Sequence, residues 1–222
     1  MSQQSNQRNK RNRRNQRKPR QPRPINEGWI PKTKLGELVQ SGLITLDKIF
    51  ANNLIVKEKE IINVLLPQLK ESVVTINMVQ QMTASGQRSR FKAVVIVGAE
   101  GFIGIGSAKS REVGPAIRKA IDRAKLSVVP VLRGCGSKEC GCGHTHSVPF
   151  KVDGKCGSVK IHLIPAPQGV GLVCADKVKQ VLKLAGIEDI WSKSFGDTRT
   201  SENLVKATFN ALKNAHKFNF NL

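Results

Sequence analysis

Three cysteines and a histidine near the middle of the chain are the residues best suited to chemistry. Cys135, Cys140, Cys142 and His146 lie within a dozen residues, and His144 is a further candidate. Three thiolates and an imidazole can close a tetrahedral Zn²⁺ shell. The spacing is not that of paired C-x₂-C knuckles, so free thiols in a glycine-rich loop, or a disulfide (disfavoured in a reducing cytosol), stay open as alternatives. We expect a structural zinc site at Cys135, Cys140, Cys142 and His146, with His144 as the competing fourth ligand.

Nucleophilic catalysis is the competing chemistry for the same residues. Cys140 or Cys142 beside His146 can in principle form a thiolate–imidazolium pair. Vicinal cysteines at metal-like spacing favour ligation instead, and the sequence contains no G-x-S-x-G elbow or recognisable carboxylate pair. Cys156 and Cys174 stand alone in strand-like surroundings and are expected to be small buried hydrophobes. Nothing in the sequence indicates an enzyme.

A second candidate site is basic and is expected to bind RNA. The segment 83–90 is polar and is predicted to be a loop around Gly86. Arg88 and Arg90 would pair with phosphates and Gly86 would let the backbone approach closely, with Gln87 beside them, although a solvated turn is the simpler interpretation. Further predicted RNA contacts follow on the next strands and on one helix face: Lys92, Lys109, Arg111, Arg118, Lys119 and Arg123.

A cluster of glycines at Gly98, Gly101, Gly104 and Gly106 resembles a nucleotide-binding loop only superficially. A G-x-G-x-x-G fingerprint would need glycine at Glu100, and the chain has no G-K-[ST] sequence. A hairpin turn and close packing of a strand against a helix explain these glycines more simply.

The elements that must position these residues can be read from periodicity. Thr33 and Thr45 are plausible N-caps of short helices, and residues 58–70 should form a helix that Pro67 bends or shortens. Strands are expected from residue 73, over 91–97 and over 102–105, with a turn at 99–101 between the last two. A helix with Glu112 and Pro115 near its start follows. The order helix, three strands, helix is that of a double-stranded-RNA-binding-like fold.

The second half predicts a β-β-α-β-α unit, so the fold class is α+β with small sheets. Strand-like segments at 128–132, 148–152 and 159–164 surround the Cys/His loop and a hairpin at 154–157. A helix begins near Asp176 and ends at Gly186; it should bury Val178, Val181, Leu182 and Ala185 and turn Lys177, Lys179 and Lys183 away. A strand at 187–191 and a helix at 201–215 complete the unit.

The charge of the whole chain points to a polyanionic partner. The 222 residues carry 37 Lys and Arg against 16 Asp and Glu, a net charge of +21. Residues 1–24 contain nine basic residues and no acid, so this tail should be disordered when free. A solubilising segment, a nuclear-localisation signal and an RNA-binding arm that includes Arg11, Arg13 and Arg14 all fit it, and the last fits best. No apolar run is long enough to span a membrane, and the N-terminus does not resemble a secretory signal.

Several motifs closely resemble one family, the universal small-subunit ribosomal proteins called S-five (S-two in older eukaryotic naming). They are SGQRSRFKA at 85–93, the glycine-rich hairpin around 104–106, REV at 111–113, VPF at 148–150, GKCGSV at 154–159, LIPAP at 163–167 and KATF at 206–209. The resemblance covers about residues 29–215. The Cys/His loop and the DTRT sequence at 197–200 resemble the archaeal branch.

The resemblance implies a two-domain ribosomal constituent that is not an enzyme. We expect a basic tail at 1–24, a helical extension at 25–72, a double-stranded-RNA-binding-like domain at 73–126, a C-terminal S-five domain at 127–215 with the Cys/His loop at 133–146, and a tail at 216–222. The implied partners are small-subunit rRNA, mRNA at its entry path and neighbouring small-subunit proteins, in the cytoplasm, with no membrane and no small-molecule substrate. The tip of the first domain's hairpin, here Gly86, Arg88 and Arg90, would influence decoding accuracy. The alternative is a zinc-containing RNA-acting enzyme, or a regulatory RNA-binding protein outside the ribosome.

Overall fold

The computed structural model describes residues 29–217, and Lys217 by its backbone alone. Three short helices come first: α2 (Lys34–Gln40), α3 (Leu46–Ala51) and α4 (Lys59–Leu65). Thr33 caps α2, since its side-chain oxygen accepts a hydrogen bond from the N–H of Gly36 at 3.2 Å. α4 ends at Leu65, two residues before Pro67, so the predicted shortening of this helix is confirmed.

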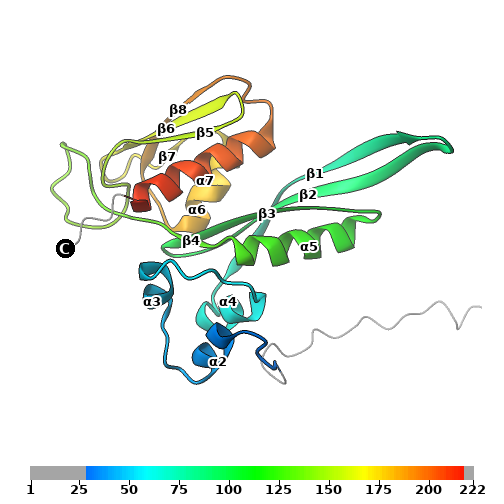
Figure 1. Cartoon of the computed structure of the whole chain (residues 1–222). Coiled ribbons are helices and arrows are strands. Elements are labelled where there is room, and N and C mark those ends of the chain that lie inside the picture. The colour runs from blue at the N-terminus through cyan, green and yellow to red at the C-terminus, as the bar shows by residue number, and fades with distance from the viewer. Residues whose placement is uncertain (1–28, 218–222) are drawn as a thin grey trace, which may run out of the picture. The chain divides into compact units, whose positions relative to one another are not determined.

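The first sheet has strand order β1-β2-β3-β4: β1 (Lys70–Thr83), β2 (Gly86–Ala99), β3 (Phe102–Ser110) and β4 (Val129–Pro130). β1 and β2 pair antiparallel from Lys70 opposite Gly98 to Thr83 opposite Gly86. β3 pairs with β2 only as far as Phe91, so the outer ends of β1 and β2 continue as a two-stranded hairpin (Figure 1). The predicted polar loop at 83–90 is therefore wrong in extent, because residues 86–90 belong to β2 and only Ala84 and Ser85 form the turn.

Helix α5 (Val113–Leu126) covers one face of this sheet, and its N-cap is Glu112. It buries Ala116, Ala120 and Ala124 against the strands, while Ile117 and Ile121 pack at the margin. The order α4-β1-β2-β3-α5 confirms the predicted double-stranded-RNA-binding-like arrangement.

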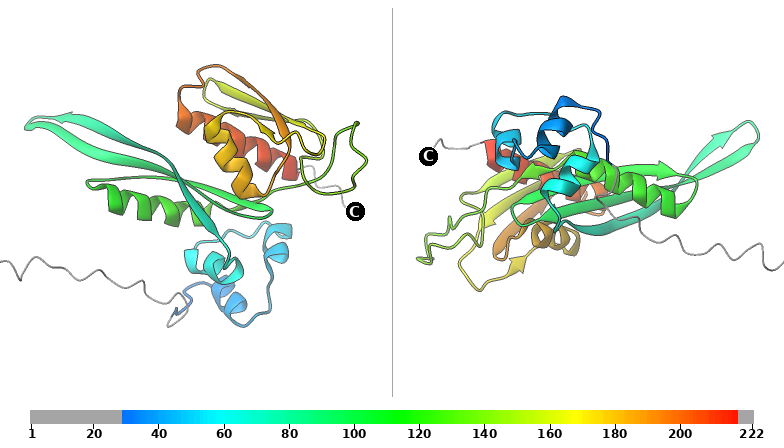
Figure 2. Two further views of the ribbon diagram at one scale, coloured as in Figure 1. Left: turned by 180° about the vertical axis from the view of Figure 1, so that it is seen from behind. Right: turned by 90° about the horizontal axis from the view of Figure 1, so that it is seen from below.

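The second sheet has strand order β5-β6-β8-β7: β5 (Val152–Cys156), β6 (Val159–Pro165), β7 (Leu172–Val173) and β8 (Ile190–Phe195). Helices α6 (Asp176–Ala185) and α7 (Ser201–Lys217) lie between this sheet and the first one, as Figure 1 and the left view of Figure 2 show. One core joins the layers: Val94 and Ile96 of β2 share it with Val181 and Leu182 of α6 and with Leu212 of α7. The arrangement from one side to the other is α5, first sheet, α6 and α7, second sheet.

Three features of the second half differ from the sequence-based expectation. Residues 148–151 form no strand, because Val148 is buried beside the Cys/His loop and its carbonyl accepts a hydrogen bond from Gly136. The predicted strand at 187–191 lies later, at Ile190–Phe195. Lys177 is not turned away from the fold, since its Nζ donates a hydrogen bond to the carbonyl of Val74 at 2.9 Å and ties α6 to β1.

The glycine cluster is explained by packing, as predicted. A Cβ at Gly106 would lie 2.1 Å from the carbonyl oxygen of Ala120, and one at Gly104 would lie 2.3 Å from that of Ala124, so α5 rests directly on the backbone of β3. Gly101 has φ +81° in the turn between β2 and β3. Among the described residues, no helix is long and apolar enough to cross a membrane.

Candidate metal centre and nucleic-acid interface

The Cys/His loop is closed at its base by backbone pairing. Gly134 and Ser147 exchange two N–H···O hydrogen bonds of 2.9 Å, and the N–H of Gly136 donates to the carbonyl of Val148. The pairing brings the two ends of the loop together. The glycines are suited to this approach, since a Cβ at Gly136 would lie 2.0 Å from the carbonyl oxygen of Pro149.

The closed loop brings four ligand atoms together: the Sγ atoms of Cys135, Cys140 and Cys142 and a ring nitrogen of His146, all within 4.8 Å of one another. The Sγ atoms of Cys142 and Cys135 are 3.6 Å apart, and Sγ of Cys140 is 3.7 Å from Nε2 of His146. A tetrahedral shell with Zn–S bonds of about 2.3 Å has edges of about 3.8 Å. These two distances match such an edge, and none of the four ligand atoms is more than 4.8 Å from another. His144 is exposed and lies outside this group.

A carboxylate on a distant segment positions the histidine. Nδ1 of His146 lies 2.9 Å from Oδ2 of Asp189, in a pair buried on both sides, although the contact lacks the alignment of a hydrogen bond. The other carboxylate oxygen of Asp189 accepts hydrogen bonds from the N–H groups of Gly169 at 3.1 Å and Gly171 at 2.7 Å. Such a carboxylate fixes the ring and directs Nε2 toward the thiols, which is the usual outer shell of a metal-binding histidine.

The pKa values of two of the loop thiols are shifted in opposite directions. The hydrogen bond from Cys142 lowers the pKa of Cys140 to about 6, below the ordinary value of a cysteine thiol. Desolvation raises the pKa of Cys135 to about 11, with the neighbouring thiols adding to the effect. A cation bound among the three sulfurs would offset the desolvation that raises the pKa of Cys135, because a metal ion favours the deprotonated form of every ligand. The four residues can thus hold a metal ion, and their donor set is that of a soft or borderline metal.

The remaining two cysteines pack against the main core but are only partly buried, so the predicted burial is confirmed in part. Cys174 is half-buried, and desolvation raises its pKa to about 11. Cys156 packs at the edge of the main core, and its thiol faces the side-chain oxygen of Asn203 at 3.9 Å.

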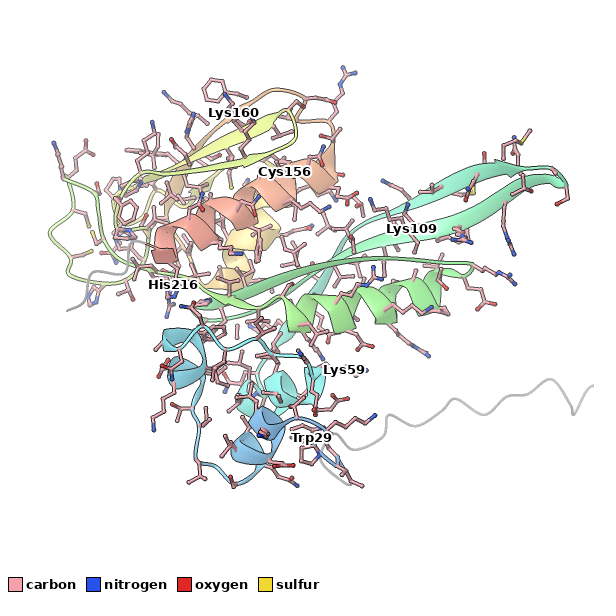
Figure 3. The ribbon with its side chains drawn as sticks, viewed as in Figure 1. Trp29, Lys59, Lys109, Cys156, Lys160 and His216 are labelled. Carbon is pink, nitrogen blue, oxygen red and sulfur yellow. The ribbon has the colours of Figure 1, made fainter. Side chains whose placement is uncertain are left out.

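The protruding hairpin has two chemically different faces. Side chains alternate along β2, and Val94 and Ile96 point to the core shared with α6. Arg88, Arg90 and Lys92 stand on that same side, and Lys109 of β3 lies opposite Lys92 in the register. We call Arg88, Arg90 and Lys109 the basic hairpin face; all three are exposed and, within the described chain, none has an ion-pair partner (Figure 3 labels Lys109). Lys92 differs, because it forms an ion pair with Glu202 of α7.

The opposite face of the hairpin is apolar. Ile76, Met78 and Met82 alternate with polar residues along β1, and Met78 lies opposite Phe91. Met78 is 58% exposed and Met82 is 73% exposed. The alternation at Ile76 and Met78 was visible in the sequence, but the sequence did not indicate that this face of β1 stays exposed.

The other predicted RNA contacts do not join the basic hairpin face. Arg118, Lys119 and Arg123 are exposed on α5, across the sheet from Arg88 and Arg90. Nη1 of Arg123 also donates to the carbonyl of Ser107 at 2.6 Å. The predicted basic rim is therefore two surfaces, one on each side of the first sheet, with Arg111 exposed at the bend between β3 and α5. Gly86 and Gln87 lie at the hairpin turn, where φ of Gly86 is +111°. Arg11, Arg13 and Arg14 lie outside the described residues.

Sequence reasoning missed Asp189 and the apolar side of the hairpin tip. Asp189 is far from the cysteines along the chain, and backbone hydrogen bonds from Glu188 and Asp189 to the carbonyl of His146 bring the two segments together. A lone aspartate after an apolar helix gives no signal of this role.

A double-stranded-RNA-binding-like domain with an exposed basic hairpin, joined to a second α+β unit with a closed Cys/His cluster, is typical of basic nucleic-acid-associated proteins rather than enzymes.

Comparison with known proteins gives the family. The model of the N-terminal domain of ribosomal protein S5 matches residues 69–132, and that of the C-terminal domain matches residues 154–220. The small ribosomal subunit protein uS5 of Pyrobaculum calidifontis is 56% identical over 192 residues, covering 86% of this chain and 95% of that protein. That of Thermofilum pendens is 55% identical with the same coverage, and that of Methanocaldococcus jannaschii is 55% identical over 187 residues, covering 83% and 86%. The chain belongs to the ribosomal protein S5 family.

Membership confirms five predictions. The relatives named are archaeal, as the loop and the DTRT sequence indicated. The chain is a structural constituent of the small ribosomal subunit and not an enzyme, which places it in the ribosome as expected. The α+β fold with its two domain types is confirmed as well. The exact domain boundaries stay a prediction; β4, at Val129–Pro130, pairs with β3 of the first sheet.

Proposed function

We propose that this chain binds small-subunit rRNA through the basic hairpin face and thereby supports subunit assembly and translational accuracy near the mRNA entry path. The observation that supports it most is the hairpin itself: two strands extend beyond the rest of the sheet and present Arg88 and Arg90 without an acidic neighbour on their face. Guanidinium groups on a narrow extension can reach phosphates that a flat surface cannot. The rigid core shared by both sheets fixes where the hairpin points.

Charge reversal tests this role. Arg88→Glu with Arg90→Glu should weaken binding to a small-subunit rRNA fragment, lower the slope of log K against log salt by about one for each lost phosphate contact, and raise misreading. Lys34→Glu with Lys48→Glu is the matched control, because it removes the same charge from exposed sites on α2 and α3. Normal subunit yield and unchanged misreading in the hairpin variant would contradict the proposal.

The apolar hairpin face supports a contact with a neighbouring small-subunit protein. Exposed Ile76, Met78 and Met82 are unsuited to phosphates, and flexible methionines are frequent at protein-binding surfaces. A photo-crosslinker at Met82 in assembled subunits should give protein adducts, whereas one at Arg88 should give RNA adducts. RNA adducts at both positions would contradict the division into two faces.

The basic tail is proposed to act as an RNA arm. This rests on charge alone: Arg11, Arg13 and Arg14 belong to a segment with nine basic residues and no acid. Removal of residues 1–24 should reduce RNA affinity at low salt much more than at about 0.5 M salt. Equal losses at both salt concentrations would contradict this role.

We also propose that the metal ion at Cys135, Cys140, Cys142 and His146 is zinc. Three thiolates and one imidazole at tetrahedral spacing match a structural zinc site, and the full set of protein ligands leaves no position for a catalytic water. The ion would join the loop ends to the segment around Asp189. The purified protein should hold about one equivalent of zinc, which Cys142→Ser should abolish and Cys156→Ser should leave intact. A folded, metal-free sample whose three loop cysteines are freely alkylated would contradict zinc.

A further inference from the structure

The second sheet has one covered face and one open face. Val152, Ile161 and Leu163 point to α6 and α7 and are buried, while the alternate residues of the same strands point the other way. Figure 3 labels Lys160 on this outward side, with α7 on the other side of the strands. We define the open sheet face by six of its residues: Lys155, Lys160, His162, Trp191, Lys193 and Phe195.

Two aromatic rings are exposed on this face. Trp191 and Phe195 lie on β8 two pleats apart, about 13 Å along the strand, and are 37% and 51% exposed. The ring of His162 meets Phe195 edge-on, with centroids 5.2 Å apart and planes at 70°, which holds the Phe195 ring in place. The chain has only two tryptophans, eight phenylalanines and no tyrosine, so two large rings in solvent on one strand are not explained by core packing.

The charge between and around the rings is positive. Lys193 stands between Trp191 and Phe195 on β8, and Lys160 lies opposite Phe195 in the register. Lys155 is opposite Lys160 on the neighbouring strand, and all three lysines are exposed. Asp153, the single acid that β5, β6 and β8 place on this face, is engaged by His162. The face therefore presents aromatic rings inside a group of uncompensated cations.

We infer that the open sheet face binds single-stranded RNA, with bases stacked on Trp191 and Phe195 and the backbone neutralised by Lys155, Lys160 and Lys193. A sheet with exposed aromatic rings and flanking lysines is suited to binding unstacked bases of any sequence, because every base has a π-face and every nucleotide has a phosphate. A protein partner fits less well, since lysine is depleted at the centre of protein interfaces. The surface is separate from the hairpin, and the inference does not depend on the role proposed for Arg88 and Arg90.

Tryptophan fluorescence tests the stacking directly. In a Trp29→Phe background of the full chain, Trp191 is the one remaining tryptophan. Titration with 12-mer oligouridylate or oligoadenylate at about 0.2 M salt should quench Trp191 saturably. Phe195→Leu in the same background should raise the dissociation constant about 5- to 100-fold, because it removes one stacking platform and keeps an apolar side chain. Lys160→Ala with Lys193→Ala should lower the salt slope by about 1.4, since each phosphate contact on a single strand contributes about 0.7.

Two controls separate stacking from charge and from the hairpin. Inorganic polyphosphate should bind the basic chain without quenching Trp191. The Arg88→Glu, Arg90→Glu variant should keep the quenching, so failure of the hairpin proposal and failure of this one are distinguishable. Absence of quenching by RNA, equal quenching by polyphosphate, or an unchanged dissociation constant in Phe195→Leu would overturn the inference. So would a photo-crosslinker at Lys160 that gives protein adducts rather than RNA adducts in assembled small subunits.

Discussion

Replacement of Gly106 by alanine should destabilise the first domain through a single added methyl group. The new Cβ would lie 2.1 Å from the carbonyl oxygen of Ala120 and 2.4 Å from the amide nitrogen of Ala124. Both obstacles are backbone atoms of α5, so no side chain can rotate away, and the helix must retreat from β3 by about 1 Å to restore ordinary contacts. Gly106 is not among the glycines with positive φ, so the cost is steric and not one of backbone strain.

The loss of stability can be sized from the packing that is weakened when α5 moves away from β3. Ala116, Ala120 and Ala124 are fully buried along the contact, and overpacking of this kind costs about 1–3 kcal/mol. We expect the upper part of that range, about 2–3 kcal/mol, because rigid backbone is displaced along the length of the helix. For a chain of this size the melting temperature should fall by roughly 4–12 °C. Gly104→Ala presses on the same helix, so the double variant should lose less than the sum of the single losses.

Urea denaturation followed by circular dichroism measures the change, and α5 itself supplies the control. Gly114 lies in the same helix with nothing within 4 Å of its added Cβ. Gly114→Ala should therefore stabilise the protein by about 0.5–1 kcal/mol, since alanine restricts the unfolded chain more than glycine does. A Gly106→Ala protein within about 0.5 kcal/mol of the wild type would refute the packing argument.

Three other changes test the ion pairs and the metal centre. Burial raises the pKa of Glu202 and hydrogen bonds from Lys206 and Lys92 lower it, with a net value below the ordinary 4.5. The stabilisation from this carboxylate is complete above pH 4.5 and is lost as the pH falls through the lowered pKa. Glu202→Gln should therefore cost about 1 kcal/mol or less at pH 7 and flatten the acid limb of the stability curve. An acid limb identical to that of the wild type would contradict this. Asp189→Asn should weaken metal binding about 10- to 100-fold, measured by competition with a chromogenic chelator, and equal affinity would remove Asp189 from the site. Chelation should lower the melting temperature of the wild type and leave that of Cys142→Ser unchanged; a fall in both would show an effect unrelated to the loop.

The sequence predicted best the elements whose own residues specify them. In α6, the spacing of Val178, Val181 and Leu182 gave the buried face, and Gly186 ends the helix with φ +78° as expected. The ligand set of the metal centre was visible for the same reason, because all four residues lie in one loop.

Elements that depend on a distant partner were predicted less well. Residues 86–90 of β2 are polar and show no alternation, and they form a strand because β1 pairs with them residue by residue across a two-residue turn. The strand predicted at 187–191 was placed too early, since Ile187 is buried after the end of α6 and pairing with β6 begins only at Ile190. Phe195 and the open sheet face were missed for that reason.

The central claim, that this chain is an integral small-subunit protein, is tested most directly by sedimentation of a native lysate through a sucrose gradient at about 0.5 M salt, where loose electrostatic binding is lost. The fold, the family and the proposed RNA contacts predict stoichiometric comigration with the small subunit. Release of the chain into the light fractions would contradict the account and would favour a basic RNA-binding protein that acts outside the ribosome.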